Sequence, residues 1–563
     1  MRHYLITLII FLLTDGLSFT IQSQQLRNPF NFPILLSGNF GELRNNHFHA
    51  GIDFKTQGVE GKAVHAAKDG FVSRISVSPW GYGNALYIDH PDGTTTVYGH
   101  LKAFNDSIAT YVRNNQYELE RFSVDLIPET NRFPVKEGDI IALSGNTGSS
   151  AGPHLHFEVR DTESDEVVDP FDYYKGQIAD KRAPKIQGVM AYPIEGKGII
   201  NGSRNKKELK LITAKNGQQI VAGKIEAWGD IAFAIKSYDY MDGTSNVYGV
   251  RKITLEADSQ LVFKSDMNRF SFDETRYLNS FVDYEEWIEK HSFYMKSFVD
   301  PGNKLCFIES VNRGIISINE ERTYHLVYQL EDAFGNKTRL SVWIDGKEQA
   351  IPAPQTNGGE YFHWKSENKF GAKGVRLTIP AGNLYDDVYF RYSVKEDSTA
   401  LAPTYLLHDR TIAIHKQAQL SIRLQKDSIE NKQQYGIVRR QNKSLLWIGG
   451  TYRNGWLDAG IRELGSFTVA RDTVPPVITP INPATWVGNR VITFRITDNL
   501  SGVKSYRGEI DGRFVLFEWD GKKGLVTYHF DKERLSKGNH KLVFTLTDAC
   551  NNVSTYEYLF INK

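Results

Sequence analysis

The chain has 563 residues, a length that exceeds one hydrophobic core and predicts several domains. Its 67 lysines and arginines nearly balance its 66 aspartates and glutamates, so the total charge indicates neither a nucleic-acid-binding protein nor attraction to an anionic membrane. Short runs of β-branched and aromatic residues alternate with glycine, asparagine and aspartate turns, which predicts a mostly β fold with little helix.

The N-terminus has the layout of a secretory signal peptide. A basic start is followed by an apolar run from Tyr4 to Leu13, which is about half of the length that spans a bilayer. We therefore expect residues 1–23 to be a cleaved signal peptide, with an uncleaved membrane anchor as the alternative. Cleavage leaves an exported protein without a stable membrane span, located in the periplasm, elsewhere in the cell envelope or outside the cell.

Cysteine usage gives no sign of a disulfide-dense scaffold. Cys306 and Cys550 are the only cysteines, and their spacing also fits no metal site. We expect both to be buried and structural.

The first candidate metal ligands lie in the segment from His47 to Asp53. In an extended chain alternate side chains share a face, so His49, Gly51 and Asp53 point to the same side, together with His47. The glycine between the two candidate ligands leaves room for a metal to approach the backbone. A lone pair at this spacing more often forms a surface hydrogen bond, and we expect His47 to be exposed.

Several short strands separated by turn signals follow and predict an antiparallel meander. The expected strands cover residues 63–67, 70–77, 85–90 and 94–100. The last one ends in His100 beside a glycine, which gives its ring clearance, although an ordinary core or turn histidine has the same pattern. Residues from about 105 to 120 are polar and weakly periodic, and we expect a helical insertion there.

A glycine-rich turn from Gly145 to Pro153 leads into a run of alternating side chains. Because strand side chains have a period of two, His154 and His156 point to one face, while Phe157 points to the other. One histidine can then bind a metal while its neighbour acts in the same site. Eight of the fifteen histidines fall in the first 156 residues, and five of them lie in the three segments described, which favours a shared site.

Taken together, these motifs resemble the lysostaphin/LytM-type zinc peptidases over roughly residues 35–175. The resemblance rests on His-x-x-x-Asp, a Tyr-Gly-His strand end, and Gly-Asn-Thr-Gly followed by Gly-Pro-His-Leu-His. It implies an antiparallel β-sheet peptidase domain in which zinc is bound by His49, Asp53 and His156. It also implies that His100 and His154 are the catalytic histidines. The long insertion after His100 departs from the family pattern and affects the expected substrate preference.

The chemistry of two histidines and one carboxylate suits zinc. Catalytic zinc sites use three nitrogen or oxygen ligands from the protein and leave a fourth position for water. Zinc lowers the pKa of that water from ~15.7 toward ~7, which supplies a nucleophile. The sequence has no His-Glu-x-x-His helix to provide a glutamate base. His100 and His154 are therefore the groups available for proton transfer, with the division of roles between them open.

The rest of the chain predicts three β-sandwich-like modules. The expected divisions are residues 24–179 for the peptidase domain, 180–349 for a sandwich with an insertion near 270–305, 350–471 for a β-rich module, and 472–563 for an immunoglobulin-like sandwich. The first and last modules share two patterns, a strand leading into an acidic turn at Asp239 and Asp498, and Asp-Ala-x-x-Asn at Asp332 and Asp548. We interpret the acidic turns as ordinary turn chemistry, with calcium binding as the alternative.

We expect an exported zinc endopeptidase that cleaves peptide stems or cross-bridges of peptidoglycan. Zinc hydrolysis follows from the site, whereas peptidoglycan follows from the resemblance. One alternative substrate is an envelope or extracellular protein. Another alternative is a non-catalytic cell-wall-binding or hydrolase-activating protein, which the intact set of site residues disfavours. We expect the β modules to position the peptidase, restrict access to it or bind an envelope protein, and Asn39 or Glu42 could supply an occluding ligand.

Overall fold

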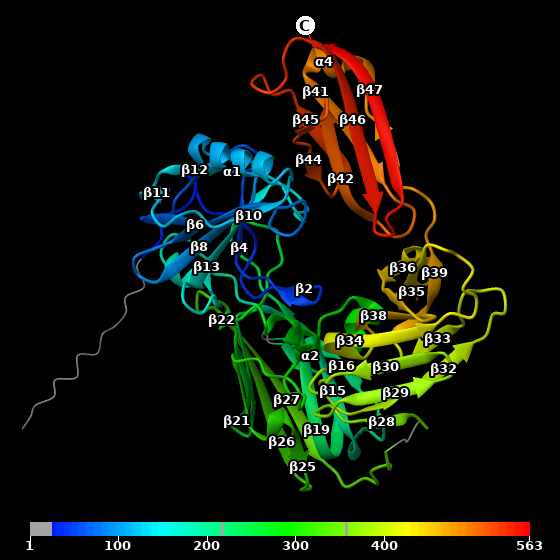
Figure 1. The fold of residues 1–563 in the computed structure, drawn as a ribbon. Coiled ribbons are helices and arrows are strands. Elements are labelled where there is room, and N and C mark those ends of the chain that lie inside the picture. The colour runs from blue at the N-terminus through cyan, green and yellow to red at the C-terminus, as the bar shows by residue number, and fades with distance from the viewer. Residues whose placement is uncertain (1–24, 216–218, 355–357, 563) are drawn as a thin grey trace, which may run out of the picture.

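The computed structural model describes residues 25–215, 219–354 and 358–562, so the expected signal peptide lies outside the described residues. About 49% of the chain is strand and 8% is helix, which confirms the predicted mostly β fold. The N-terminal region (residues 25–178) is followed by a first β module (185–346), a second (360–471) and a third (477–562). In Figure 1 these parts form an open ring in which the third β module returns to the N-terminal region.

The N-terminal region is built on an antiparallel sheet with the strand order β1-β4-β13-β8-β7-β6-β10. Its consecutive strands β6, β7 and β8 pair with one another, which confirms the expected meander. The expected strand at residues 63–67 instead pairs with β12 in a separate sheet, because the turn before Gly70 redirects the chain. The elements are β1 Leu36–Gly38, β2 Leu43–Arg44, β3 His47–Phe48, β4 Ile52–Lys55, β5 Ala63–His65, β6 Gly70–Val77, β7 Asn84–Asp89, β8 Thr94–Leu101, β9 Ala103–Phe104, α1 Asp106–Glu118, β10 Val124–Leu126, β11 Pro134–Val135, β12 Ile140–Leu143, β13 His154–Asp161, β14 Val167–Val168 and η1 Pro170–Tyr173.

The helical insertion is present as α1. Asn105 caps the helix, since its side chain accepts a hydrogen bond from the amide of Ile108. Ile108 and Val112 are buried and pack into the core of the N-terminal region. The opposite side of this insertion faces the third β module, as described below.

The first β module contains one large sheet and the expected insertion, which includes the short helices η2, α2 and α3. β22 of this module pairs with β14 of the N-terminal region, and Phe48 enters the core of the module, so the two units share a continuous apolar contact. The elements are β15 Lys185–Ile200, β16 Lys207–Leu209, β17 Leu211–Thr213, β18 Gln219–Val221, β19 Glu226–Tyr238, β20 Lys252–Ala257, β21 Gln260–Asp266, β22 Arg269–Phe270, η2 Thr275–Tyr277, α2 Leu278–Phe281, α3 Tyr284–Lys290, β23 Met295–Lys296, β24 Ile308–Ser310, η3 Asn312–Gly314, β25 Ile316–Ile318, β26 Thr323–Glu331 and β27 Lys337–Gly346.

The second β module contains two five-stranded sheets and a short two-stranded sheet around its own hydrophobic core. Alternating burial along β34 and β38 shows that each strand places one face in that core. The elements are β28 Glu360–Phe362, β29 Asn368–Ala372, β30 Val375–Ile379, β31 Val388–Phe390, β32 Tyr392–Lys395, β33 Thr404–Leu407, β34 Ala413–Arg423, η4 Lys432–Gln434, β35 Tyr435–Gln441, β36 Ser444–Gly449, β37 Thr451–Arg453, β38 Trp456–Glu463 and β39 Gly465–Arg471.

The third β module is a sandwich of two four-stranded antiparallel sheets. Phe494 from one sheet and Phe544 from the other meet in its core with ring centroids 4.7 Å apart. The elements are β40 Val477–Pro480, η5 Pro483–Thr485, α4 Trp486–Asn489, β41 Val491–Thr497, β42 Val503–Ile510, β43 Arg513–Val515, β44 Glu518–Asp520, β45 Leu525–His529, β46 Gly538–Asp548 and β47 Val553–Asn562.

The two cysteines differ from each other. Cys550 is buried as expected, whereas Cys306 is exposed, so the prediction that both are buried is wrong for Cys306. The reason is local, because Cys306 lies in a turn just before β24 at the surface of the insertion. Both thiols are free.

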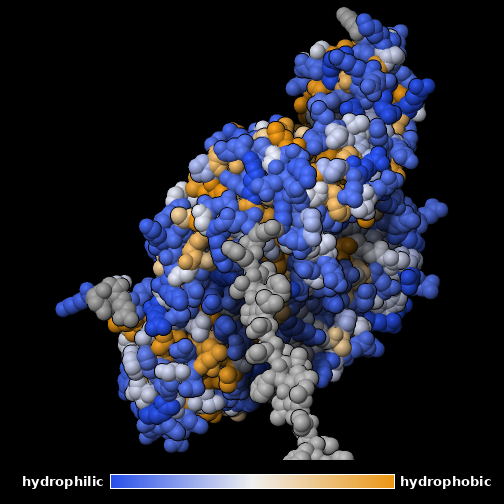
Figure 2. All heavy atoms as spheres, turned by 90° about the vertical axis from the view of Figure 1, so that its left-hand side faces the viewer, coloured by the Kyte–Doolittle hydropathy of each residue, from blue (hydrophilic) through white to orange (hydrophobic). Residues whose placement is uncertain are grey.

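The surface is mostly polar. The face shown in Figure 2 is largely hydrophilic, with small hydrophobic patches scattered over it. Within the described ranges, every helix is too short or too polar to cross a membrane.

Candidate metal centre and active site

The candidate ligands Asp53 and His156 lie directly opposite each other on the neighbouring strands β4 and β13. On its other side His156 pairs with Gly99 of β8. A Cβ atom at Gly99 would lie 3.3 Å from the Cβ of His156, so glycine leaves space for the imidazole. The central strand β13 therefore presents His156 between the two strands that contribute the other site residues.

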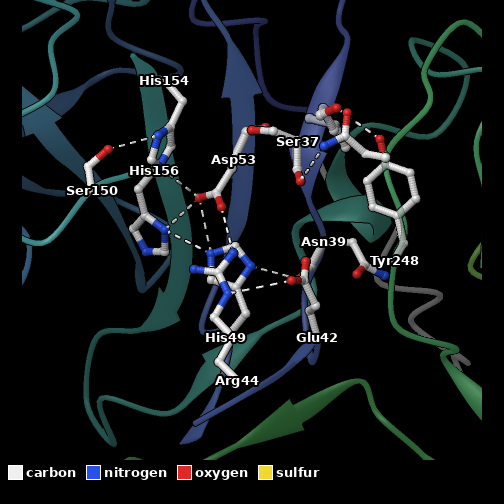
Figure 3. A network of polar contacts seen from close by, with 12 residues as sticks. Ser37, Asn39, Glu42, Arg44, His49, Asp53, Ser150, His154, His156 and Tyr248 are labelled. Carbon is white, nitrogen blue, oxygen red and sulfur yellow. Dashed lines mark hydrogen bonds and ion pairs between the residues drawn. The ribbon is translucent and has the colours of Figure 1, made fainter. Parts of the chain in front are cut away.

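The donor atoms of the three candidate ligands converge (Figure 3). Nε2 of His49 lies 3.1 Å from Oδ1 of Asp53. Nδ1 of His156 lies 3.0 Å from the same oxygen and 3.0 Å from Nε2 of His49. All three side chains are buried. The structure thus brings together the three residues that the sequence analysis names as metal ligands.

The two candidate catalytic histidines lie beside this cluster. Nε2 of His154 is 3.4 Å from Oδ1 of Asp53. In a regular strand His100 would point away from the face that carries Gly99 and His156. A register shift in the pairing of β7 with β8, and a left-handed φ of 60° at His100, turn its ring back toward the site. Its ring centroid lies 4.8 Å from that of His154.

Each of the four imidazoles is oriented by a hydrogen bond from one ring nitrogen. This bond leaves the other nitrogen directed at the common centre, which is the usual device for presenting a histidine to a metal or a substrate. The acceptors are the carbonyl oxygens of Asn39 for His49 (2.7 Å), Thr147 for His100 (2.9 Å) and Gly152 for His154 (2.8 Å), and the Glu158 carboxylate for His156 (2.7 Å).

Glu158 is the centre of a buried polar network behind His156. Its carboxylate accepts hydrogen bonds from Tyr82 at 2.5 Å and from Nε of Arg160 at 2.8 Å, in addition to the one from His156. Glu158 has no exposed surface, so these partners compensate for the burial of its charge. The network fixes the imidazole of His156 with Nδ1 toward Asp53.

Arg44 holds the other side of the cluster. Its guanidinium donates to Oδ2 of Asp53 at 2.7 Å, which leaves Oδ1 to face the histidines. Glu42 lies 3.7 Å from the same guanidinium. Figure 3 shows Arg44 between Glu42 and the cluster, so the carboxylate of Glu42 is not one of the converging donors. Asn39 also does not occlude the centre, because its side chain bonds to the backbone of Gly249.

The environment sets the protonation of the site in the metal-free protein. Burial lowers the pKa of His49 to about 4, and burial with the nearby His156 lowers that of His100 to about 3, so both rings are neutral at neutral pH. Burial also acts to lower the pKa of His156, but the hydrogen bonds to Asp53 and Glu158 outweigh it and raise the pKa to about 9. His156 therefore carries a proton that a metal ion would displace.

The donor set fits a zinc ion. His49 is neutral, Asp53 is held with one oxygen toward the centre, and His156 is oriented by a buried carboxylate, which is how protein zinc ligands are commonly supported. A catalytic zinc site with three protein ligands keeps a fourth position for a water or a substrate group. Such an arrangement can perform metal-assisted hydrolysis.

Two expectations about nearby residues have different outcomes. His47 is exposed, as expected, and its Nδ1 bonds to the carbonyl of Asn45 at 2.9 Å. The role given to Gly51 is wrong, because a Cβ there would come within 2.1 Å of the carbonyl oxygen of Phe157. Glycine is required at this position for the close approach of the backbone to β13, not for access of a metal.

Sequence reasoning missed the residues that support the ligands. Glu158 and Arg160 continue the same alternation as His154 and His156 along β13, so the period of two contained a signal for both. Arg44 reaches Asp53 from a different strand, and no spacing in the sequence indicates that contact.

The third β module contacts the loop that precedes His154. Nζ of Lys522 donates to the carbonyl oxygen of Ser150 at 2.8 Å and also bonds to Asn146. Trp519 packs against Trp80 with ring centroids 5.8 Å apart. A second contact joins α1 to the module, since Arg113 and Asp531 form an ion pair of 2.6 Å.

These contacts border a groove of about 670 Å³. Its lining includes the loop residues Asn146 and Gly148, the α1 residue Arg113, and Trp519 and Lys523 from the third β module. The insertion after His100 forms one wall of this groove, whose lining includes none of the five candidate site residues.

Residues 47–117 and 125–170 match the model of peptidase family M23. The N-terminal region belongs to peptidase family M23. This confirms the expected lysostaphin/LytM-type peptidase domain, and the matches support a metalloendopeptidase. The match includes all five candidate site residues, which are His49, Asp53, His100, His154 and His156.

Named relatives share the M23 domain. The chain is 35% identical over 118 residues to DD-carboxypeptidase/endopeptidase Mpg of Neisseria meningitidis serogroup B, covering 21% of each chain. It is 32% identical over 161 residues to peptidoglycan DD-endopeptidase ShyB of Vibrio cholerae, covering 26% of this chain and 32% of that one. The solved catalytic domain of lysostaphin from Staphylococcus simulans aligns at 25% identity over 25% of this chain and 93% of that chain, with a TM-score of 0.20. The chain thus spans only about a fifth to a third of the length of these curated relatives.

A second family model matches further along the chain. Residues 359–472 match a Zu5-like domain, a segment that coincides with the second β module. The M23 domain and the Zu5-like segment together leave the first and third β modules outside the matched residues.

Proposed function

We propose that this chain is an exported, zinc-dependent endopeptidase that hydrolyses peptide bonds in the stems or cross-bridges of peptidoglycan. The proposal rests above all on the convergence of the donor atoms of His49, Asp53 and His156 beside His100 and His154. The M23 domain supports the reaction class. The substrate class is supported by a relative named as a peptidoglycan DD-endopeptidase.

In this proposal His49 Nε2, Asp53 Oδ1 and His156 Nδ1 hold zinc. The bound ion would supply a Lewis acid and a hydrolytic nucleophile at neutral pH. Arg44 and Glu158 keep the ligands oriented, the first through Asp53 and the second through His156. No glutamate base of the His-Glu-x-x-His kind is among the converging residues, so proton transfer falls to the adjacent histidines.

His100 and His154 each present Nε2 to the same space, because each Nδ1 donates to a backbone carbonyl. One imidazole accepts a proton during attack on the scissile carbonyl. The other stabilises the charge that develops on the carbonyl oxygen or donates to the leaving amine. Proton transfer of this kind contributes ~10²–10⁴-fold to the rate.

We also propose that the substrate peptide approaches through the groove between the M23 domain and the third β module. The groove is lined by residues of the loop that precedes His154 in the chain, and Lys522 bonds to that loop. The β modules would then position the enzyme, limit access to the groove or bind an envelope protein. The division of the chain near residues 180, 350 and 472 belongs to the same proposal, and the second and third β modules each have a hydrophobic core of their own. Placement in the cell envelope is also part of this proposal.

The test is to incubate the zinc-loaded protein with purified peptidoglycan and to identify new peptide termini by mass spectrometry. The expected result is new amino and carboxyl ends that a His154→Ala variant with the same zinc content does not make. Absence of new ends from the zinc-loaded, folded protein would contradict the substrate class. Equal cleavage by the His154→Ala variant would contradict the assigned role of that histidine.

A further inference from the structure

A second cluster of acidic residues lies outside the active site. Carboxylate oxygens of Asp180, Asp239 and Asp332 lie within 4.8 Å of one another, and all three residues are buried. They come from three separate places, namely the linker before β15, the end of β19 and the end of β26. Three carboxylates therefore meet where the M23 domain joins the first β module.

Two oxygen atoms of this cluster have no partner in the described structure. The carboxylate of Asp332 has hydrogen-bond partners within its own turn, because it accepts from the amides of Phe334 and Asn336. Oδ1 of Asp180 accepts from two backbone amides, but its Oδ2 is buried without a hydrogen bond, and so is Oδ1 of Asp239. Asp239 is only 4% exposed and Asp180 only 9%. Turn chemistry explains Asp332 but leaves these two oxygens unexplained.

Arg182 favours the charged form of Asp239 but forms no ion pair with the cluster. Within the described residues, no ion pair includes any of the three aspartates. The nearby guanidinium of Arg182 donates instead to the carbonyls of Met241 and Thr244. Burial, together with the charges of Asp332 and Asp180, raises the pKa of Asp239 to about 8. Buried carboxylates are normally paired or bound to a metal, so the cluster lacks a positive partner.

The same framework recurs in the third β module. There Asp472, Asp498 and Asp548 form an equivalent group, and Oδ1 of Asp498 is again buried without a partner. In both modules an asparagine four residues after the last aspartate donates to that carboxylate and to the carbonyl of the linker aspartate. The distances are 2.7 and 3.2 Å for Asn336, and 2.8 and 3.1 Å for Asn552.

We propose that Asp180, Asp239 and Asp332 bind one divalent cation of the calcium class. Calcium takes oxygen ligands at ~2.3–2.6 Å in flexible geometry, which suits three converging carboxylates supplemented by backbone carbonyls and water. In this proposal the two buried, unpartnered oxygens of Asp180 and Asp239 become ligands. This site is distinct from the histidine-containing centre of the M23 domain and does not depend on the proposed peptidase activity.

The position of the site indicates that the cation would stabilise the contact between the first β module and the N-terminal region. Asp239 exchanges two backbone hydrogen bonds with Tyr248, whose hydroxyl donates to the carbonyl of Leu36 in β1 at 2.8 Å. The next residue, Gly249, bonds to the side chain of Asn39, and the carbonyl of Asn39 accepts from His49. Figure 3 shows Asn39 and Tyr248 beside the active site. The cation thus fastens the first β module to the segment that orients a candidate metal ligand.

The test uses the full chain with its histidine centre loaded with zinc. Calcium chloride is titrated by isothermal calorimetry, with magnesium chloride as a parallel probe, and the thermal midpoint is measured with and without calcium. The expected result is saturable calcium binding, a higher thermal midpoint in calcium, and one fewer bound calcium ion in the Asp239→Asn variant. Asp273→Asn makes the same change at an exposed carboxylate of this module and should bind as the parent does.

An Asp180→Asn variant is a second test in case the Asp239→Asn variant does not fold, because Asp180 lies in the linker and not at the end of a strand. Each variant is checked by circular dichroism and by its zinc content. The proposal is overturned if the parent protein binds no calcium, or if folded Asp239→Asn and Asp180→Asn variants both bind as many calcium ions as the parent. Peptidoglycan cleavage is not a readout here, so failure of the enzymatic proposal leaves this result unaffected.

Discussion

Glu158 accepts a hydrogen bond from Nε2 of His156 at 2.7 Å, and both residues lie on the same face of β13. This bond directs Nδ1 of His156 toward Asp53 and away from the core. Tyr82 and Arg160 hold the carboxylate in turn. Glu158 therefore orients His156 from the Nε2 side of the ring, whereas the candidate metal-binding atom is Nδ1 on the other side.

The Glu158→Gln variant should bind zinc ~10–100-fold more weakly, the usual effect of removing such a supporting partner. The glutamine amide is neutral, so it forms no ion pair with Arg160. It also accepts a weaker hydrogen bond from Nε2 of His156. Competition with a metal chelator measures the affinity. Glu163→Gln makes the same change at an exposed position and should leave it unaltered. Equal affinities for both variants would show that Glu158 does not position His156.

Substitution of the histidines should separate metal binding from turnover. His154→Ala should keep zinc and lose ~10²–10⁴-fold in kcat, because His154 is not among the converging donors. His49→Ala should lose zinc and activity together. His47→Ala removes an exposed histidine two residues away and should retain both. Zinc content by mass spectrometry and peptide release report the two properties, and full activity in zinc-free His49→Ala would refute the ligand assignment.

Zinc binding should release a proton from His156. Hydrogen bonds to Asp53 and Glu158 raise its pKa to about 9, so the ring is protonated in the metal-free protein at neutral pH. A metal needs the deprotonated nitrogen, so apparent affinity should rise with pH toward about 9, by up to ~tenfold per unit for one proton, and then level off. Calorimetry in buffers of different ionisation enthalpy counts the protons. An affinity that falls as pH rises through this range would contradict the assignment.

The Lys522→Ala variant should loosen the loop before His154. The lysine holds the carbonyls of Ser150 and Asn146, and these bonds are lost. Amide hydrogen exchange of residues 145–153 should become several-fold faster while the thermal midpoint changes little, because a partly exposed contact contributes ~1 kcal/mol or less. Lys523→Ala serves as the control, since Lys523 pairs with Asp520 within its own module. Unchanged exchange in Lys522→Ala would show that the loop is held by other contacts.

Side-chain alternation was sufficient to predict part of the site and insufficient for the rest. His154 and His156 share a face of β13 as the period of two requires, and the same rule extends to Glu158 and Arg160. His100 breaks the rule, because a register shift and a left-handed backbone turn its ring to the site face. The resemblance supplied that residue where the pattern could not.

Contacts between distant segments were not predictable from local pattern. Arg44 reaches Asp53 across strands, and Lys522 reaches the loop of the M23 domain from near the other end of the chain. The mostly β fold and the helical insertion follow from composition and periodicity, which depend on neighbours in sequence. The assignment of Cys306 to the core was wrong because burial of an isolated residue depends on which elements cover it.

The contact between Lys522 and the carbonyl of Ser150 can form only after most of the chain has been synthesised. A ribosome completes the M23 domain, with every candidate ligand and both candidate catalytic histidines, long before it reaches residue 522. During that interval the nascent domain already has its full set of site residues but lacks one wall of the groove. The last module to be synthesised therefore completes the groove, and a chain that ends before residue 477 keeps the candidate site residues but lacks that wall.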